Sequence, residues 1–174
     1  MENKLNNLKP PPLPDKVHKM VIGTKVCLFQ KVSETTVLNV VTPQYKVLLG
    51  RKQTDTLWGF PGGKCDPDET FEQTCIREMK EETNVCLEEN NLHYLKSFLM
   101  KKQGETQSRL YILFAAPLKG AFKAGDDIVE LRLFPLEDLD NVLLLAHKPM
   151  GKEVKNYLYN EGNQYISLDS LLEE

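Results

Sequence analysis

The chain has 174 residues, of which 41% are hydrophobic and 27% charged, and its formal net charge is −3. This composition is typical of one globular domain with enough apolar sequence for a sizeable core. Acids and bases are interspersed without a strongly basic face, which argues against binding to bulk nucleic acid or to a membrane surface.

Neither the start of the chain nor its cysteines indicates export or a metal cluster. Residues 1–17 are polar and contain four prolines, which predicts an extended arm ahead of a single domain over residues 18–174. No apolar leader and no stretch of membrane-spanning length is found. The four cysteines form no CxxC pair, and no histidine stands near them at zinc-ligand spacing. We therefore expect reduced thiols in a cytoplasmic protein.

The first part of the chain is predicted to be β-structure. Met20–Phe29, Thr36–Val41 and Tyr45–Leu49 are rich in β-branched and aromatic residues, which favour strands. Thr42–Gln44, with its central proline, is predicted to form the hairpin turn between the second and third of these strands.

The rest of the chain alternates between helix and strand. Glycines and a proline within residues 59–63 predict a loop, and helices are expected over Phe71–Thr83 and Ala146–Tyr159. Because strands outnumber helices and both types alternate, we predict the α/β (α+β) class, with a mixed sheet covered by helices. The three further strands are predicted over Leu92–Met100, Leu110–Pro117 and Val129–Leu136.

The expected helix over Phe71–Thr83 carries three glutamates on one face. Glu78, Glu81 and Glu82 stand at i, i+3 and i+4, where each like-charged pair costs about 0.2–0.5 kcal/mol. They lie in the last turns, where the helix dipole disfavours negative charge. Glu78 and Glu82 also border the apolar stripe, so they need a compensating partner. A divalent cation would supply one, since carboxylate oxygens are the ligands that Mg²⁺ and Mn²⁺ prefer.

Other interpretations stay open for this segment. The acidic run could be a solvated helix end in which Arg77 pairs with Glu81. Glu69 could close a capping box that begins at Asp66, while Thr70 begins a rival box one turn later. The sequence alone does not choose between the two caps.

Two adjacent glycines precede the helix. Gly62 and Gly63 allow the backbone to approach a ligand closely, just before a helix start whose amides and dipole favour anions. A carboxylate-bound metal beside a loop that tolerates anions is a combination suited to phosphate chemistry.

The residue types of the segment Gly63–Val85 and the spacing between them resemble the Nudix box. Residues 58–63 and 130–139 also resemble their counterparts in that family, so the resemblance extends from about Val21 to Leu139. One position departs from the pattern, because Asn84 stands where the family has glycine, and asparagine is the next most tolerant residue in a left-handed conformation. The matching positions are Gly63, Glu69, Arg77, Glu78, Met79, Glu81, Glu82 and Val85.

The resemblance implies a mixed sheet sandwiched between helices and a Mg²⁺-dependent hydrolase, with Mn²⁺ as a possible substitute. Its substrate would carry a pyrophosphate bond in a nucleoside diphosphate linked to another group. Glu78 and Glu82 would be the principal metal ligands, with Glu81 as a third or water-mediated ligand. The backbone carbonyl of Gly62 would complete the metal site.

The resemblance also implies roles in catalysis. Arg77 would orient the carboxylates by pairing with Glu69. Glu78 is the first choice for the general base and Glu130 the second, and for Glu130 an outward-facing position on a strand is the alternative.

Basic residues near the box are the candidates for holding substrate phosphates. Arg51 is preferred, since a guanidinium grips phosphate in two places, and Lys52, Lys64 and Gly63 are the further candidates. Ordinary surface positions are the alternative for all three cations. Trp58 and Phe60 are expected in the core rather than stacked on a base.

The expected partner is therefore a small nucleotide. The stretch LWGFPGGK favours a nucleoside triphosphate, and ADP-ribose or another nucleoside diphosphate sugar is the alternative. An inactive nucleotide-sensing module of the same fold ranks lower, because every glutamate of the box is present. The sequence does not indicate an oligomeric state.

Overall fold

The computed structural model describes residues 19–37, 40–101 and 107–163. The predicted N-terminal arm, residues 1–17, lies outside this range. The described residues contain a five-stranded sheet with the order β3-β4-β1-β2-β5. Its strands are β1 (Lys19–Val37), β2 (Val40–Lys52), β3 (His93–Lys101), β4 (Gln107–Pro117) and β5 (Ile128–Pro135).

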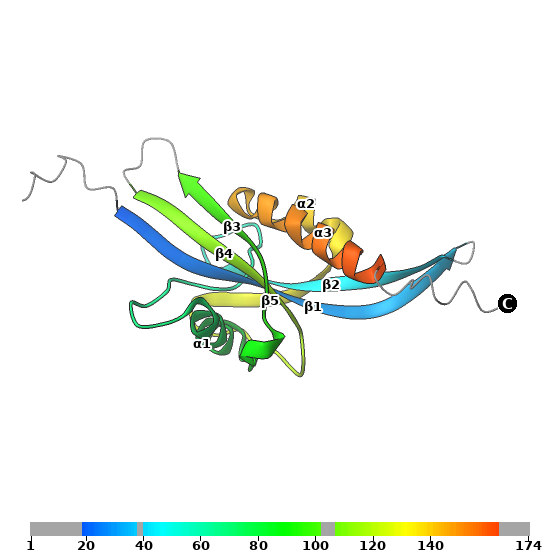
Figure 1. The fold of residues 1–174 in the computed structure, drawn as a ribbon, viewed down its shortest axis with the longest axis horizontal. Helices are drawn as coiled ribbons and strands as arrows, with labels where there is room; N and C mark the ends of the chain where they lie inside the picture. Colours follow the sequence, from blue (N-terminus) through cyan, green and yellow to red (C-terminus); the bar gives the residue numbers. More distant parts are fainter. Residues whose placement is uncertain (1–18, 38–39, 102–106, 164–174) are drawn as a thin grey trace, which may run out of the picture.

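The sheet is mixed, as predicted. β1 pairs with β4 in parallel, whereas β1–β2, β2–β5 and β3–β4 are antiparallel. The first strand of the chain is therefore central, and the strand beside it comes from more than seventy residues later in the sequence. Figure 1 shows β1 and β2 continuing together past the rest of the sheet as a two-stranded ribbon.

The predicted hairpin turn is wrong. Residues Thr42, Pro43 and Gln44 lie inside β2, opposite residues 33–35 of β1. The chain reverses between Val37 and Val40 instead. β5 pairs with β2 only from Lys46 onward, so Pro43 lies in a part of β2 whose outer side has no strand neighbour among the described residues. A proline is tolerated in such an edge position because its missing amide hydrogen is not needed there.

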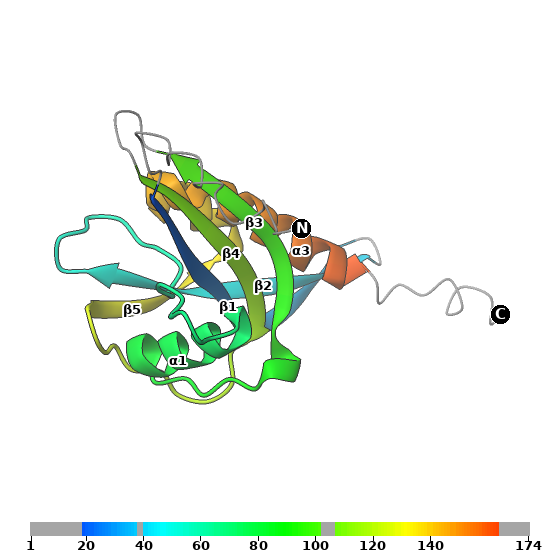
Figure 2. The ribbon, with the colours of Figure 1, turned by 60° about the vertical axis from the view of Figure 1, so that its left-hand side comes forward.

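Helices cover both faces of the sheet, which confirms the predicted sandwich. α1 (Phe71–Thr83) packs on one face, and α2 (Leu139–Val142) and α3 (Lys148–Asn163) lie on the other, as Figures 1 and 2 show. No described helix has the length and apolar character needed to cross a membrane. Three short 3₁₀ segments complete the elements of the described residues: η1 (Glu89–Asn91), η2 (Leu136–Asp138) and η3 (Leu145–His147).

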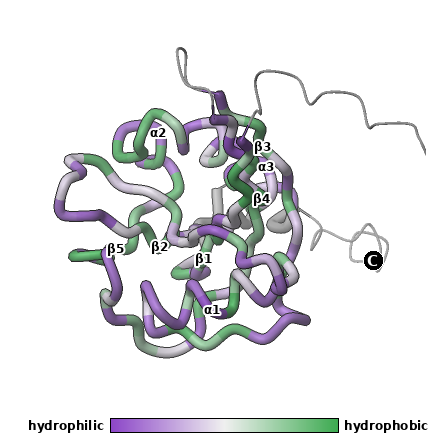
Figure 3. The backbone as a smooth tube through the Cα atoms, turned by 90° about the vertical axis from the view of Figure 1, so that its left-hand side faces the viewer, coloured by the Kyte–Doolittle hydropathy of each residue, from purple (hydrophilic) through white to green (hydrophobic). Residues whose placement is uncertain are grey.

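Each face of the sheet has its own apolar core. On the α1 side, Cys75 and Met79 pack against alternate residues of β1 and β2 such as Leu28 and Leu48. In Figure 3 the tube of α1 carries both hydrophilic and hydrophobic colours, as expected of a helix with one buried face. On the other side the α2 and α3 residues Leu139, Met150, Val154 and Leu158 cover Cys27, Val47 and Leu49.

The ends of α1 show which cap the sequence uses. Thr70 is the N-cap: its hydroxyl accepts from the Gln73 amide at 3.1 Å, and the Gln73 side chain accepts from the Thr70 amide at 2.9 Å. This reciprocal pair is a capping box, and Glu69 separately accepts from the Asp66 amide at 3.4 Å. At the other end Asn84 has φ 58° and ψ 16°, the left-handed conformation that its position in the box predicts.

Asn84→Gly is expected to change the free energy of unfolding by less than about 1 kcal/mol. Glycine relieves the left-handed backbone, but the exposed hydrogen bond from Lys80 Nζ to Asn84 Oδ1, 3.1 Å long, is lost. Asn84→Ala is the matched control and should cost about 1–2 kcal/mol, because its Cβ clashes in this conformation. Urea unfolding measures both, and a larger loss for glycine than for alanine would contradict this account.

Candidate active site

The loop that precedes α1 is fixed against the ends of β1 and β2. Gly59 exchanges two backbone hydrogen bonds of 2.9 Å with Gly50, and the carbonyls of Pro61 and Gly63 accept from the amides of Val26 and Thr24 at 2.9 Å. The loop therefore behaves as a short extra strand beside β1. These backbone contacts hold the loop beside the sheet, and the Gly62 amide is left to face α1, where it donates to Glu82.

The two adjacent glycines of the loop, Gly62 and Gly63, are required by their surroundings. Gly62 has φ +127°, and a Cβ there would lie 2.5 Å from the Thr24 carbonyl oxygen. A Cβ on Gly63 would lie 2.2–2.4 Å from the carboxylate of Glu78. The first glycine thus permits the backbone path, and the second makes the space that a helix carboxylate fills.

Two glutamates of α1 face this loop and are nearly buried. Glu78 is 8% exposed and Glu82 3% exposed. Glu82 Oε2 accepts a 2.6 Å hydrogen bond from the Gly62 amide. Burial raises the pKa of Glu82, and the charge of Glu78 raises it further, whereas Lys25 and the Gly62 amide oppose the shift. The charge of Glu78 acting on the buried Glu82 is the unfavourable arrangement that the sequence suggested.

Arg77 orders the acidic residues around it. Its guanidinium holds Glu69 at two points, Nε to Oε1 at 2.7 Å and NH2 to Oε2 at 2.9 Å. NH1 donates to Glu78 Oε1 at 2.7 Å and to Glu81 Oε2 at 3.1 Å. The Arg77 hydrogen bonds lower the pKa of Glu69 to about 2. The carboxylate of Glu81 is thereby drawn toward Arg77, and the Glu81 side chain is half exposed.

The donor set fits a magnesium ion that shares its coordination with substrate. Among the described residues, no three acidic, histidine or cysteine side chains converge into a preformed metal cage. Glu78 and Glu82 nevertheless face the glycine loop together, and Mg²⁺ is commonly bound by one or two carboxylates, waters and substrate phosphates. The Gly62 carbonyl, a third candidate ligand, accepts a hydrogen bond from Lys25 Nζ.

Arg51 and Glu130, predicted respectively as phosphate ligand and second-choice base, are paired with each other. They are opposite one another on β2 and β5, and Arg51 NH2 lies 2.8 Å from Glu130 Oε2. Arg132 donates to the other oxygen of Glu130 at 2.7 Å. The hydrogen bond from Arg51, supported by Arg132, lowers the pKa of Glu130. Both arginines lie over the Trp58 ring, at 5.7 and 5.2 Å, so this cluster is on the face of the sheet opposite α1.

The other predicted residues are distributed as follows. Trp58 and Phe60 are buried in the core beneath α2 and α3, the position expected for them. The side chain of Lys64 is exposed, and its backbone carbonyl accepts from Arg77 NH2 at 3.0 Å. Of the predicted cations, Arg51 and Lys64 lie outside the wall of the pocket described next, whereas Lys52 is part of it.

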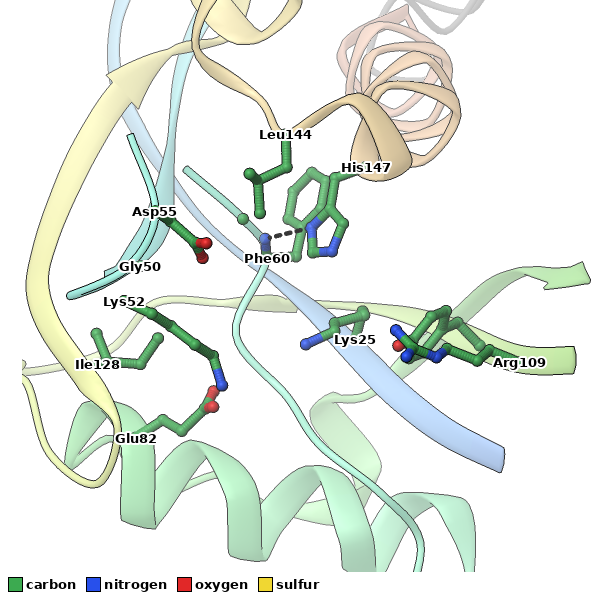
Figure 4. A pocket seen from close by; sticks show the side chains of 12 residues that line it. Lys25, Gly50, Lys52, Asp55, Phe60, Glu82, Arg109, Ile128, Leu144 and His147 are labelled. Atoms are coloured by element: carbon green, nitrogen blue, oxygen red, sulfur yellow. Dashed lines mark hydrogen bonds between the residues drawn. The ribbon is translucent and has the colours of Figure 1, made fainter. Parts of the chain in front are cut away.

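A pocket of about 250 Å³ opens beside Glu82, between the glycine loop and the start of α3. In Figure 4 the Lys52 side chain extends toward Glu82, and Lys25 lies on the other side of the loop that carries Phe60. Lys52 also forms an ion pair with Asp127. The wall includes three cations from three different strands and one imidazole: Lys25, Lys52, Arg109 and His147.

Sequence reasoning missed Lys25, Arg109 and His147. One signal for Lys25 was available, because a lone lysine interrupts the apolar run of a strand that becomes central in the sheet. Arg109 carried no such signal, since only the parallel pairing of β1 with β4 brings it to this end of the sheet.

His147 is held in one protonation state. Its Nδ1 accepts a 3.0 Å hydrogen bond from the Phe60 amide, and its ring stacks on that of Phe60 at 6.0 Å and 7°. Burial lowers the pKa of His147 to about 3. Because Nδ1 is an acceptor, the proton of the neutral ring is assigned to Nε2, which makes His147 a hydrogen-bond donor in the pocket wall.

Comparison with known proteins identifies the family. The NUDIX domain model matches residues 31–157. An ADP-ribose pyrophosphatase from Methanocaldococcus jannaschii is 30% identical over 123 residues, which cover 68% of this chain and 69% of the relative.

Solved structures agree with this match. The MutT/nudix family protein from Enterococcus faecalis superposes with a TM-score of 0.55 at 25% identity; the match covers 72% of this chain and 47% of that protein. The NUDIX domain of Shewanella oneidensis NrtR, solved in complex with ADP ribose, gives 0.62 at 22% identity over 87% of this chain and 94% of that domain. A glycine loop facing two buried glutamates, within a domain that matches the family model and an archaeal pyrophosphatase, shows that the chain belongs to the Nudix hydrolase family.

Proposed function

We propose that this protein is a Mg²⁺-dependent pyrophosphohydrolase that cuts a nucleoside triphosphate into monophosphate and pyrophosphate. The observation that carries the proposal is the position of Glu78 and Glu82, two nearly buried carboxylates that face a glycine loop beside a cation-lined pocket. Such carboxylates have little structural use without a cation, because burying like charges together is unfavourable.

The chemistry divides between a metal and the protein. A divalent ion bound by Glu78 and Glu82 supplies Lewis-acid polarisation and neutralises charge on the phosphates. Glu78 is our choice as general base for the attacking water. Arg77 donates to its Oε1, and Oε2 has no hydrogen-bond partner among the described residues, so one oxygen is oriented and the other can accept a proton. Arg77, fixed by Glu69, keeps this carboxylate in place.

The pocket favours a substrate with a high negative charge. Lys25, Lys52 and Arg109 line its wall, and Glu82 stands at one side. A triphosphate chain, with more charge than the diphosphate of ADP-ribose, uses these three cations and the metal more fully. His147 offers an N–H donor, which is suited to a carbonyl or ring nitrogen of the nucleobase of the substrate.

ADP-ribose is the second candidate. The archaeal relative that shares 30% identity is named for its action on this compound, and the NrtR domain of similar fold was solved with it. A third possibility, a sensing module without activity, is disfavoured because Glu78 and Glu82 are both present and both face the loop.

Glu78→Gln and Glu82→Gln should each lower turnover by at least about a hundredfold while the fold stays intact. Each substitution keeps the side-chain volume and removes a charge from the metal site. Glu153→Gln, on α3 and paired with Lys96, is the matched control and should leave turnover unchanged. Circular dichroism checks the fold, and near-normal turnover in both site variants would refute the assignment of the metal ligands.

Glu130→Gln separates the two candidates for the general base. Because Arg51 and Arg132 hold Glu130 on the opposite face from α1, we expect less than about a tenfold loss of turnover. A loss as large as that of Glu78→Gln, measured at saturating substrate and metal, would transfer the role of the base to Glu130.

A nucleotide panel tests the substrate, and EDTA should abolish every activity found. A triphosphate yields pyrophosphate, which becomes detectable as phosphate only after inorganic pyrophosphatase is added. ADP-ribose yields AMP and ribose 5-phosphate, which release phosphate only with added phosphatase. Strong turnover of ADP-ribose with none of any triphosphate would make the second candidate correct, and turnover that survives EDTA would exclude metal-dependent hydrolysis.

Protonation of His147 should make the folded protein less stable in acid. The pKa of His147 is about 3 in the folded protein and near its ordinary 6.5 in the unfolded chain. Below about pH 6.5 only the unfolded chain takes up this proton. The contribution of neutral His147 to the free energy of unfolding is therefore complete above that pH and is lost as the pH falls toward 3.

The comparison is with His147→Asn, which is uncharged throughout. Between about pH 7 and about pH 5 the wild type should lose about 1–2 kcal/mol more unfolding free energy than the variant. Urea unfolding at each pH measures the difference, in which the acidic groups common to both proteins cancel. Parallel pH profiles would show that His147 is freely protonated in the folded state.

A further inference from the structure

Lys25 is a cation in an unusual position. It lies on the central strand β1, between the buried residues Thr24 and Val26, and its side chain reaches the glycine loop. There its ammonium donates a hydrogen bond to the carbonyl oxygen of Gly62. It also lies 5.9 Å from the centre of the Tyr111 ring, on the neighbouring strand β4.

The ammonium of Lys25 binds a carbonyl oxygen that a metal ion would also use as a ligand. The Gly62 carbonyl is the candidate backbone ligand of the metal site, and the Gly62 amide is bound to Glu82. Glu82 and Glu78 both attract the Lys25 charge, whereas Lys52 repels it. One protein cation therefore occupies the carbonyl that would otherwise bind a divalent ion, and it lies within the electrostatic influence of both carboxylates.

Binding of a divalent ion beside this ammonium is electrostatically unfavourable. Like charges a few ångströms apart repel strongly where water is largely excluded. The lysine has a flexible four-carbon stem with rotatable donors, so it can move its charge without a change in the backbone. The direction open to it is the pocket, whose wall it already forms with Lys52 and Arg109.

We propose that Lys25 is a positioning residue that exchanges partners: it competes with the divalent ion for Gly62, and when the ion binds it turns to a phosphate of the nucleotide. This inference rests on the proposed function for its second half, since the phosphate belongs to the substrate. Its first half concerns only the protein and the metal. The exchange links metal binding to substrate binding, because the ion releases the cation that the nucleotide needs.

A purely structural lysine makes a different prediction. If Lys25 only pinned the loop, its removal would disorder the site, and metal and substrate would both bind more weakly. Exchange predicts opposite signs: without Lys25, the metal binds more tightly and the nucleotide more weakly.

The test is Lys25→Met, which keeps the length of the side chain and removes its charge. Mn²⁺ binding to the nucleotide-free protein, followed by electron paramagnetic resonance, should tighten by at least about fivefold. The KM for the best nucleotide of the panel should rise by at least about tenfold, with a smaller change in kcat. Lys96→Met is the matched control: it removes an exposed lysine paired with Glu153 and should change neither quantity.

Unchanged or weaker Mn²⁺ binding by Lys25→Met would overturn the proposal. If that variant does not fold, Lys25→Arg keeps the charge and should retain the wild-type Mn²⁺ affinity. In the wild type, Mg²⁺ should then shift the ¹³Cε signal of Lys25, which is assigned by its absence from Lys25→Arg, and no shift would also overturn the proposal. These binding measurements need no turnover, so a protein that hydrolyses no nucleotide would refute the proposed function and leave the competition at Gly62 testable.

Discussion

The site depends on burying two like-charged carboxylates against a backbone loop. Glu78 and Glu82 are taken out of water on the same helix face, which is unfavourable unless each finds a positive partner. Arg77 supplies one to Glu78, and the Gly62 amide, with the nearby charge of Lys25, supplies one to Glu82. The other features follow from this constraint, because the loop must be glycine to leave room and must be tied to β1 to stay in place.

The helix and its immediate surroundings could be predicted because their determinants are local. Phe71–Thr83 begins and ends where the sequence indicates, with a side-chain cap at Thr70 and a left-handed residue at Asn84. The pairing of Arg77 with Glu69 also follows from the motif, since both residues lie within one short segment. Sequence could not choose between the two caps, because Asp66 with Glu69 and Thr70 with Gln73 both have capping-box residues at the required spacing.

What the sequence could not give is the direction of side chains and the pairing of distant strands. Arg51 was the preferred phosphate ligand, but strand alternation directs it to the Trp58 face, while its neighbour Lys52 reaches the pocket past an irregularity in the β2–β5 pairing. The turn expected at Thr42–Gln44 failed for a related reason: a proline breaks a ladder only where a neighbouring strand needs its amide.

The parallel pairing of β1 with β4 also has a consequence for folding kinetics. Lys25 on β1 faces Leu113 across this ladder, so the pocket wall requires two segments separated by 88 residues to meet. Non-local parallel pairings form slowly, because the entropy of closing a long loop is lost before the contacts are gained. During synthesis the α1 segment is complete by Thr83, whereas β4 ends only at Pro117. The carboxylates of the site can therefore be in helical order well before the sheet that gives them a substrate pocket is assembled.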